Sequence, residues 1–502
     1  MNIVDRLLNK ITMYRVVLYG LGIIAVYTFI LAFIGRLSYS PLDLFVTIVT
    51  LTFVCYFGNL LLAKLFRATV NAESSMITAL ILFFLLWPSS KTENVLIFVL
   101  AGVIAMSSKY IFAYKKKHIF NPAAIACVSL LFVQSGGAWW IATPALLPAA
   151  LIVGFLIVRK VRKFTMFFTF SAVALIAFLI QAQIRNLDVM AEAYQFFTSF
   201  PVIFFGTVML TEPLTTPPTR RLQILYAVLL GILFSYQGTL GPIILTTELV
   251  LIVGNIFSFV VSPKYKLYLK LISKQKIAKD TYEYSFNRPK AFHFKPGQYL
   301  EWTLPMLITD GRGNRRYFTI ASSPTEETIK ISVRHNELAS SFKQHLSRLS
   351  QNQKIAAGQL TGDFTLPENS GKLVFIAGGI GITPFRSMTK YILDSNLKKE
   401  VTLFYANKSV EEIAYKELFA EASRKIGFKV VYILTEREAI PPGWAGERGR
   451  IDEQMLKKYI FGLKDRTYYL SGPNAMVESY KKLLKKLGVS SSSIRTDYFP
   501  GF

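Results

Sequence analysis

Two patterns of hydrophobic and polar positions divide the chain at about residue 265. Before it, apolar runs follow one another, each long enough or nearly long enough to cross a bilayer as a helix. They lie at about 15–35, 41–63, 75–88, 93–113, 119–136, 139–158, 164–183, 195–211, 221–237 and 241–262. Because many more runs follow the first, it predicts a span and not a cleaved signal peptide. We expect a multi-pass α-helical membrane domain of about ten spans over residues 1–262.

After residue 265 the apolar positions are spaced as in soluble proteins. Residues 330–334 and 401–405 alternate side chains as half-buried strands do, and amphipathic helical stretches lie between such segments. Strand and turn signals dominate residues 265–367, whereas strand and helix alternate over 368–502, as a parallel sheet requires. We expect a β domain followed by an α/β domain.

Charge along the chain fits this division. The sequence has 57 Lys and Arg against 31 Asp and Glu, a net charge of +26 that either nucleic-acid binding or a positive-inside membrane protein would explain. Basic residues gather before the first run and after every second run, near residues 6–15, 64–67, 115–117, 159–163, 220–221 and 264–270. The alternation favours a partner that is membrane lipid and not nucleic acid. It places both termini on the cytoplasmic side of the cell membrane.

Cysteine and histidine are too scarce for most metal-based redox centres. The two cysteines, Cys55 and Cys127, lie in apolar runs, and the chain has four histidines. Four thiolates are the usual minimum for an iron–sulfur cluster, and structural zinc needs grouped Cys and His. His118 is the only histidine before residue 262, which excludes a bis-histidine haem of the ferric reductase or NADPH oxidase kind. We expect no metal site and no disulfide framework.

A glycine-rich turn is the clearest local signal for a ligand site. The apolar strand Leu373–Ala377 leads into the turn, and a helical stretch to about Leu393 follows it. The residues concerned are Gly378, Gly379, Gly381, Thr383 and Pro384. Glycine lets the backbone approach a pyrophosphate, the threonine can cap the helix, and proline suits its first turn. For this motif alone, an ordinary strand-to-helix turn is an equally good explanation.

A second signal is the segment Arg316–Thr319, which leads to two serines. A cation can meet a flavin phosphate, an aromatic ring can pack on the isoalloxazine, and a hydroxyl can reach its N5 edge. Taken alone, such a segment is usually only a strand, but several motifs follow one another in order. They are Gly297–Tyr299, Arg316–Thr319, Ser340–Ser341, Gly362–Phe364, the glycine turn, Ser471–Pro473 and Thr496–Phe499. In this order, about 265–502 resembles the ferredoxin-NADP reductase superfamily.

The resemblance implies a β-barrel FAD-binding domain over 265–367 and a NAD(P)-binding α/β domain over 368–502. FAD would be held by Arg316, Phe318, Thr319, Ser340 and Ser341. The nicotinamide nucleotide would be held by the glycine turn with Gly472 and Pro473. Phe499 and Phe502 would cover the flavin face. The expected catalytic residues are Thr319, Ser471 and Phe502. Phe318 stands where the family usually has Tyr, and Ser471 where it often has Cys.

The choice between NADH and NADPH rests on the segment after the second strand of the α/β domain. Tyr405–Lys408 followed by Glu411 and Glu412 resembles the NADH-using cytochrome reductases more than the NADP-using branch. Lys408 is an argument against this choice, because a cation there could meet an extra phosphate. The sequence favours NADH and leaves NADPH open.

The first half also carries motifs. Phe120–Ala124 and Thr211–Thr219, together with about ten spans, resemble the flavin-carrying membrane subunits of the sodium-translocating NADH:quinone reductase and of the Rnf electron-transport complex. Those proteins carry FMN attached to a threonine, and the nearest candidate here is Thr143. A threonine bonded to its own helix backbone explains Thr143 equally well. Trp139 and Trp140 are interpreted as interface anchors.

Ionisable residues inside spans are expensive and often functional. Asp43 and Glu212 lie near the ends of predicted runs, where capping or solvation explains them. Glu248 is placed in the middle of the last run, as a candidate contact for an ion or a quinone.

Together these features predict a membrane-bound NAD(P)H dehydrogenase. Hydride would pass from NADH to FAD, and electrons would continue to a membrane flavin or quinone acceptor, since haem and iron–sulfur centres are set aside. Two other classes stay open: a transporter whose nucleotide-binding domain senses redox state, and an assembly protein that docks other electron carriers.

Overall fold

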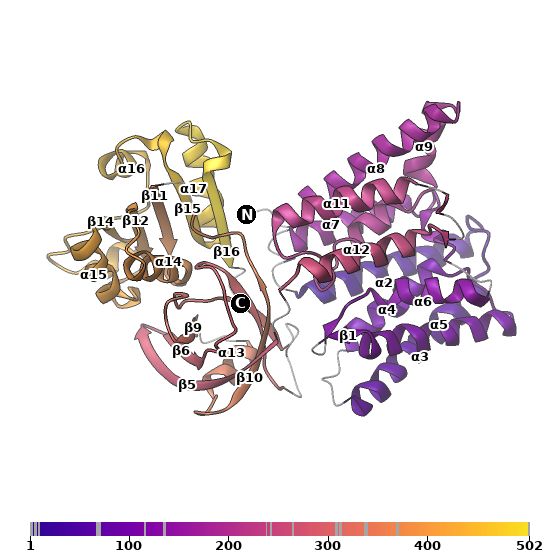
Figure 1. Cartoon of the computed structure of the whole chain (residues 1–502), viewed down its shortest axis with the longest axis horizontal. Helices are drawn as coiled ribbons and strands as arrows, with labels where there is room; N and C mark the ends of the chain where they lie inside the picture. The colour runs from indigo at the N-terminus through magenta and orange to yellow at the C-terminus, as the bar shows by residue number, and fades with distance from the viewer. Residues whose placement is uncertain are drawn as a thin grey trace. The chain divides into compact units, whose positions relative to one another are not determined.

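The chain, described here from a computed structural model, divides into two compact units. One is Leu7–Ser262, and the other is Pro263–Phe502 with Met1–Arg6. Figure 1 shows the first as a set of helices and the second as strands and helices together. The structure describes residues 4, 8, 11–66, 72–114, 117–133, 137–236, 238–240, 243–263, 266–306, 310, 314–335, 340–367 and 371–499.

Helices make up the Leu7–Ser262 unit. Among the described residues, four of them are long and apolar enough to cross a membrane. They are α2 (Met13–Phe33), α3 (Pro41–Leu65), α5 (Thr92–Ile111) and α8 (Phe164–Ile184). The shorter ones are α4 (Ala72–Leu85), α6 (Pro122–Leu130), α7 (Leu147–Val161), α9 (Val189–Thr198), α10 (Val202–Phe204), α11 (Arg220–Ser235) and α12 (Thr247–Val261). Two short hairpins pair β1 (Ala113–Tyr114) with β2 (Lys117–His118), and β3 (Thr239–Leu240) with β4 (Ile243–Ile244).

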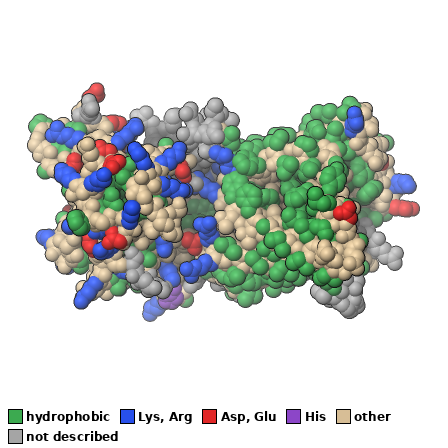
Figure 2. Space-filling view, turned by 90° about the horizontal axis from the view of Figure 1, so that it is seen from above, with side chains coloured by type: hydrophobic (Ala, Val, Ile, Leu, Met, Phe, Trp, Pro, Cys, Tyr) green, Lys and Arg blue, Asp and Glu red, His purple; other side chains and the backbone are tan. Residues whose placement is uncertain are grey.

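Apolar side chains cover the outside of this unit as well as its interior. Figure 2 shows hydrophobic side chains over much of its visible face. Ile23 is 62% exposed and Phe53 61%, while Leu21 and Leu51, on the same two helices, are fully buried. Contiguous apolar surface of this kind is rare on soluble monomers and typical of helices that face lipid.

Three of the predicted continuous runs are interrupted. In 119–136, helix α6 starts only after Asn121, whose side-chain oxygen accepts hydrogen bonds from the Ala123 and Ala124 N–H groups at 3.1 and 3.2 Å. It ends at Leu130 and continues as the 3-10 turn Leu131–Val133. In 139–158, helix α7 starts at Leu147, because Trp139 has a φ of 45° and a 3-10 turn follows it.

The third interruption lies in the run 195–211. Helix α9 ends at Thr198, and Pro201 precedes the single turn α10 and the π-helix η3 (Phe205–Met209). Proline restricts the residue before it and cannot donate to a helix, so the run breaks there. Hydropathy alone missed these breaks because the average over each run stays apolar even where Asn121, Trp139 or Pro201 interrupts the helix.

The first part of the C-terminal unit is an antiparallel sheet wrapped around one core. Its strands are β5 (Lys266–Ala278), β6 (Thr281–Asn287), β7 (Tyr299–Thr303), β8 (Arg315–Thr319), β9 (Thr328–Arg334) and β10 (Lys354–Thr361). They are ordered β8-β7-β10-β5-β6-β9. Side chains from all these strands and from α13 (Ser341–Ser347) share the core, which includes Tyr284, Phe286, Trp302 and Phe342. The alternating pattern predicted such strands.

The second part is a parallel sheet covered on both faces. Its strands are β11 (Lys372–Gly378), β12 (Glu400–Asn407), β13 (Lys429–Leu434), β14 (Glu447–Arg448), β15 (Thr467–Pro473) and β16 (Ile494–Phe499), in the order β14-β13-β12-β11-β15-β16. One core packs against α14 (Thr383–Asp394) and α15 (Lys416–Ile426), the other against α16 (Glu453–Tyr459) and α17 (Asn474–Lys486). Ligands of such sheets bind at the carboxyl ends of the strands.

Candidate functional site

The glycine turn lies at the carboxyl end of β11, where it packs tightly on its neighbours. A Cβ atom at Gly381 would lie 2.4 Å from the Ser471 carbonyl oxygen, and one at Gly378 would lie 2.4 Å from the Met476 sulfur. Gly379 has a φ of +52°, which favours glycine. Three positions of the turn therefore carry no side chain, which suits the close approach of a diphosphate.

The helix that follows the turn corrects one expectation. Pro384 stands in the first turn of α14, as predicted. Thr383, however, does not cap the helix: its hydroxyl donates to the Ile380 carbonyl oxygen at 3.3 Å. The reason is that the 3-10 turn η4 (Gly379–Ile382) runs directly into α14, so Thr383 is already helical.

The loop Ser471–Pro473 ends the neighbouring strand β15 beside the glycine turn. Ser471 pairs with Ala377 in the parallel register, and a Cβ atom at Gly472 would lie 3.2 Å from the Gly378 nitrogen. The Ser471 hydroxyl is buried and has no hydrogen-bond partner within the described part of the chain. Leaving a buried hydroxyl unsatisfied costs about 1–3 kcal/mol, so this atom calls for a polar partner, either a water molecule or a ligand. The structure thus brings the predicted glycines together with Ser471 and Pro473.

The predicted flavin residues lie on β8 and at the start of α13. Phe318 and Arg316 stand opposite Leu300 and Trp302 of β7. Both contact the Phe342 ring of α13, at 5.8 Å between ring centres and 5.4 Å from the guanidinium carbon. The strand places the cation and the aromatic ring next to the same helix, as the resemblance implies.

Hydroxyl groups complete this region. Ser340 caps α13 and accepts from the Lys343 N–H at 3.4 Å, while the Ser341 N–H donates to the Asp310 carboxylate at 2.9 Å. The Thr319 hydroxyl is buried and, among the described residues, has no hydrogen-bond partner. Like Ser471, Thr319 therefore offers a buried polar atom to a ligand.

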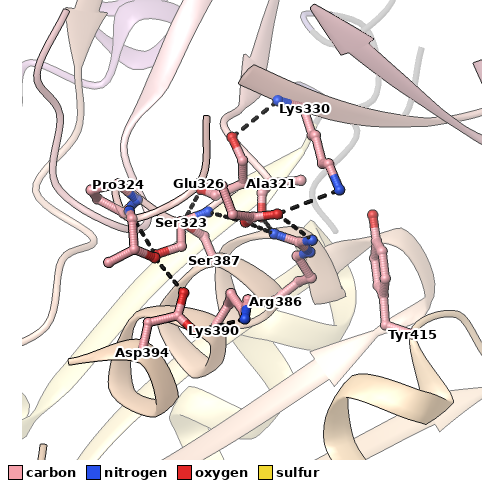
Figure 3. Close-up of polar contacts among 12 residues, drawn as sticks. Ala321, Ser323, Pro324, Glu326, Lys330, Arg386, Ser387, Lys390, Asp394 and Tyr415 are labelled. Carbon is pink, nitrogen blue, oxygen red and sulfur yellow. Dashed lines mark hydrogen bonds and ion pairs between the residues drawn. The ribbon is translucent and has the colours of Figure 1, made fainter. Parts of the chain in front are cut away.

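A largely buried ion pair joins α14 to the turn between β8 and β9 (Figure 3). Arg386 of α14 contacts both carboxylate oxygens of Glu326, with Nη2 2.9 Å from Oε1, and donates to the Ala321 carbonyl oxygen at 3.2 Å. Burial raises the pKa of the Glu326 carboxyl, but the hydrogen bond and charge of Arg386 outweigh it, and the pKa is lowered. Because Ala321 closely follows Thr319 and Arg386 closely follows Gly381, the pair fixes the end of β8 relative to the glycine turn.

Tyr415 extends this network toward β6 and β9. Its hydroxyl donates to Glu283 at 2.8 Å and contacts Ser332, and its ring lies 5.7 Å from the Arg386 guanidinium. Burial, together with the nearby Glu283 charge, raises the pKa of Tyr415 well above its usual value, so the hydroxyl keeps its proton. Lys330 lies 3.4 Å from both Glu283 and Glu326. None of these residues was singled out from the sequence, because the contacting positions lie as much as 132 residues apart.

A second charged group lies at the carboxyl ends of β12 and β13. The Lys408 side chain forms an ion pair with Glu436 at 2.8 Å, and the Lys408 backbone N–H donates to the Glu412 carboxylate at 3.2 Å. Glu412 in turn contacts Arg334 of β9. Lys408 was the residue that weighed against NADH, because its charge could meet the extra phosphate of NADPH. In the structure this charge is paired with the Glu436 carboxylate. Glu436 was missed by the motif interpretation, although an acidic residue just after a parallel strand was the available signal.

In the helical unit, Glu248 lies elsewhere than predicted. It stands in the first turn of α12 and not in the middle of a span, since that helix begins at Thr247. Its carboxylate is buried and accepts from Trp139 Nε1 at 2.7 Å. Trp140 Nε1 donates to the Phe83 carbonyl oxygen at 2.6 Å. Both tryptophans are buried, so their interpretation as interface anchors is wrong.

Glu212 and Asp43 lie near helix ends, as expected. Glu212 accepts from Asn121 Nδ2 at 3.0 Å and from Thr215 at 3.1 Å, and lies 3.4 Å from His118. Asp43, in the first turn of α3, accepts from the Ser90 N–H at 2.7 Å. Glu212 therefore holds the start of α6 to the loop after η3.

Three remaining predicted residues have different outcomes. The Thr143 hydroxyl has no hydrogen-bond partner in the described part of the chain, so its expected bond to its own backbone is absent. The backbone of Phe499 ends β16. Phe502 lies outside the described residues.

Comparisons with known proteins bear on the C-terminal region. Residues 375–482 match the family model described as an oxidoreductase NAD-binding domain. The glycine betaine monooxygenase reductase subunit of Pseudomonas aeruginosa is 29% identical over 222 residues, which cover 44% of this chain and 60% of that protein. The flavohemoprotein of Bacillus subtilis is 29% identical over 212 residues, which cover 41% of this chain and 51% of that protein. The chain spans less than two thirds of the length of these curated relatives.

Solved structures show similarity over about the same share of the chain. The Amycolatopsis cytochrome P450 reductase is 24% identical with a TM-score of 0.42, covering 47% of this chain and 70% of that one. The FAD/NAD-binding domain of the nitric oxide dioxygenase from Vibrio cholerae is 19% identical with a TM-score of 0.41, covering 46% and 98%. The predicted class is confirmed at this level: the C-terminal part of the chain is similar to FAD-dependent NAD(P)H oxidoreductases.

Proposed function

We propose that this protein is a membrane-bound NADH dehydrogenase that takes hydride from NADH onto FAD and passes electrons to a flavin or quinone acceptor in the membrane. The observation that carries the proposal is the close packing of two glycine-containing turns at the carboxyl ends of β11 and β15, with the buried Ser471 hydroxyl in the second turn. Such an edge of a parallel sheet accommodates a dinucleotide.

The nicotinamide nucleotide fits the glycine turn. Its diphosphate would lie on Gly378, Gly379 and Gly381 at the start of α14, where Thr383 and Pro384 begin the helix. The nicotinamide end would lie toward Ser471, with Gly472 and Pro473 forming the wall of the site. Holding the ring in place and excluding water are the contributions these residues make to hydride transfer.

FAD fits the β8 region for a similar reason. Arg316 would meet its phosphates, Phe318 would pack beside its ring, and the unsatisfied Thr319 hydroxyl would bond to it. Ser340 and Ser341 would lie near the diphosphate, and Phe499 and Phe502 would cover the exposed ring. When bound, FAD supplies the ability to accept a hydride and release single electrons.

Arg316→Ala tests the flavin site against a matched neighbour. We expect FAD to bind about tenfold more weakly, because one charge-assisted bond to phosphate is lost. Arg315→Ala is the control, since Arg315 lies on the other face of β8, 3.8 Å from Glu301. Titrating the FAD-stripped full-length protein with FAD measures both dissociation constants. Equal weakening in the two variants would contradict the assignment.

Glu436 supports NADH as the preferred nucleotide. With the diphosphate on the glycine turn, the adenosine would extend along the sheet edge over the ends of β12 and β13. There Glu436 pairs with the Lys408 ammonium group and Glu412 accepts from the Lys408 backbone N–H, so a 2′-phosphate would meet negative charge.

Glu436→Ser should therefore raise kcat/KM for NADPH by about tenfold and change that for NADH much less, because Lys408 is released to meet the extra phosphate. Steady-state oxidation of both nucleotides with ferricyanide measures the ratio. Glu438→Ser, two residues further along, is the control. An unchanged NADPH to NADH ratio in Glu436→Ser would place the adenosine elsewhere.

The Leu7–Ser262 unit supports a membrane acceptor. Its four long apolar helices, its apolar outer surface and the interrupted segments at α6, α7 and η3 suit a membrane domain of about ten membrane-inserted segments, some of them broken. We assign it the electron-transfer role of the membrane proteins that it resembles in the sodium-translocating NADH:quinone reductase and the Rnf complex. A second flavin, FMN, is proposed at Thr143, whose buried hydroxyl faces no described partner.

The decisive experiment uses the full-length protein in nanodiscs. NADH should bleach the FAD absorbance, and decylubiquinone should restore it with continuous turnover. Bleaching without any turnover would instead favour a redox-sensing transporter, and absence of bleaching with either nucleotide would overturn the enzyme assignment. Flavin fluorescence that stays with the denatured polypeptide in wild type and is lost in Thr143→Ala tests the FMN site.

A further inference from the structure

We infer that one outer surface of the antiparallel sheet binds anionic lipid headgroups, an interaction that rests on the membrane location proposed above. We call this surface the β5 face. It consists of Lys266, Tyr268, Lys270 and Ile272 of β5 with Lys354 of β10.

The β5 face is built by strict alternation along the strand. Leu267, Leu269 and Leu271 point into the core and are 7%, 0% and 2% exposed. The side chains between them point outward, and Tyr268 remains 54% exposed and Ile272 42%. Lys266 lies 5.6 Å from the centre of the Tyr268 ring. Lysine beside exposed aromatic and aliphatic groups is the composition of a membrane interface.

Two positive charges on the β5 face lie in positions where they destabilise the sheet. Lys270 stands directly opposite Lys354 in the antiparallel register. Like charges in directly opposed positions destabilise a sheet, and in the described part of the chain neither lysine has a carboxylate in an ion pair. A phosphate group between them would convert this repulsion into attraction. The arrangement therefore indicates an anionic ligand.

The short connection to α12 limits the distance between the end of that helix and the β5 face. Helix α12 ends at Val261 and β5 begins at Lys266, so only four residues separate them. Five Cα steps span at most about 18 Å, whatever the orientation of the two units. If α12 ends at the cytoplasmic surface of the bilayer, the first lysine of the face cannot leave the neighbourhood of the headgroups. Each lysine near an anionic membrane surface contributes about 1 kcal/mol of attraction.

Fluorescence quenching by lipid tests the β5 face in the full-length protein. Cys55 and Cys127 are buried, so a fluorophore will react with an introduced Tyr268→Cys. The control is Phe461→Cys, since Phe461 is 94% exposed on the part that follows α16. Both are reconstituted in nanodiscs of phosphatidylcholine alone or with 30% phosphatidylglycerol (about one lipid in three), each containing a headgroup-labelled quencher lipid.

We expect at least about threefold stronger quenching at position 268 than at 461, and only in the anionic nanodiscs. Lys270→Gln/Lys354→Gln should remove that difference, whereas Lys482→Gln/Lys486→Gln, with the same loss of charge on α17, should keep it. Equal quenching at both positions, or quenching that ignores phosphatidylglycerol, would overturn the inference. Cross-linking between two copies through position 268 would assign the face to a second copy of the chain. NADH oxidation by ferricyanide is measured on every sample. It distinguishes failure of the lipid-binding inference from failure of the proposed function.

Discussion

Replacing Gly381 with alanine should lower kcat/KM for NADH oxidation by at least about 100-fold. The new Cβ atom would lie 2.4 Å from the Ser471 carbonyl oxygen and 2.7 Å from the Gly472 Cα atom. These are backbone atoms that cannot rotate away, so β15 and the glycine turn must separate. Ser471 would then lose its position relative to the nucleotide. Stopped-flow measurement of flavin bleaching by NADH gives the rate directly.

Gly371→Ala provides the matched control for this prediction. Nothing lies within 4 Å of a Cβ atom at Gly371, which precedes the same strand, β11. We expect this variant to keep wild-type rates and both variants to keep their FAD, because the atoms nearest to a Cβ atom at Gly381 belong to β15 and not to β8. Normal rates in Gly381→Ala would show that the nucleotide does not use this turn.

Arg386→Met should destabilise the C-terminal unit by about 3–5 kcal/mol, because it leaves the Glu326 carboxylate buried without its main partner. The side chains of Arg386 and Glu326 are only 9% and 15% exposed. The remaining cation, Lys330, is shared with Glu283, so it cannot compensate fully. Urea unfolding of the full-length protein in nanodiscs, followed by release of flavin fluorescence, measures the loss.

The double variant Glu326→Gln/Arg386→Met separates the buried charge from the packing. It should recover most of the stability, since no unpaired carboxylate remains. The pH dependence gives a second check. Because the pKa of Glu326 is lowered in the folded state, its contribution is fully present above the unfolded pKa of about 4.3 and is lost as pH falls through the folded value. Wild type and Arg386→Met should therefore converge at low pH; an equal gap at every pH would contradict the ion-pair explanation.

The sequence predicted the C-terminal half better than the N-terminal half. The physical reason is that the motifs of the C-terminal half are encoded by residues close together in the sequence. A glycine turn between a buried strand and a helix is a local feature, so Gly378, Gly381 and Pro384 were found where they were expected. Arg386, Glu326 and Tyr415 meet only through the tertiary fold. No pattern within a short window could connect them.

In the apolar half, hydropathy reports burial in lipid or protein but not the continuity of a helix. Trp139 and Trp140 contribute the same hydropathy to a sequence window whether they lie in a folded loop or in a membrane span. Both are buried in the protein. Pro201 and the left-handed backbone of Trp139 interrupt predicted runs that stay apolar on average. For the same reason Glu248 was placed in the middle of a span, although it lies in the first turn of helix α12.

Helix α6 has a consequence for how this protein is made. Its nine residues extend about 14 Å, roughly half the hydrocarbon thickness of a bilayer, so in the proposed membrane location it would not insert as an independent segment. The groups that satisfy Asn121 at its start, Glu212 and Asn255, lie 91 and 134 residues further along the chain. During synthesis, the hydrogen bonds that hold the start of α6 can therefore form only after residues 212 and 255 have been made. In a bilayer, this region would be completed last, after its neighbours on both sides have been threaded through the membrane.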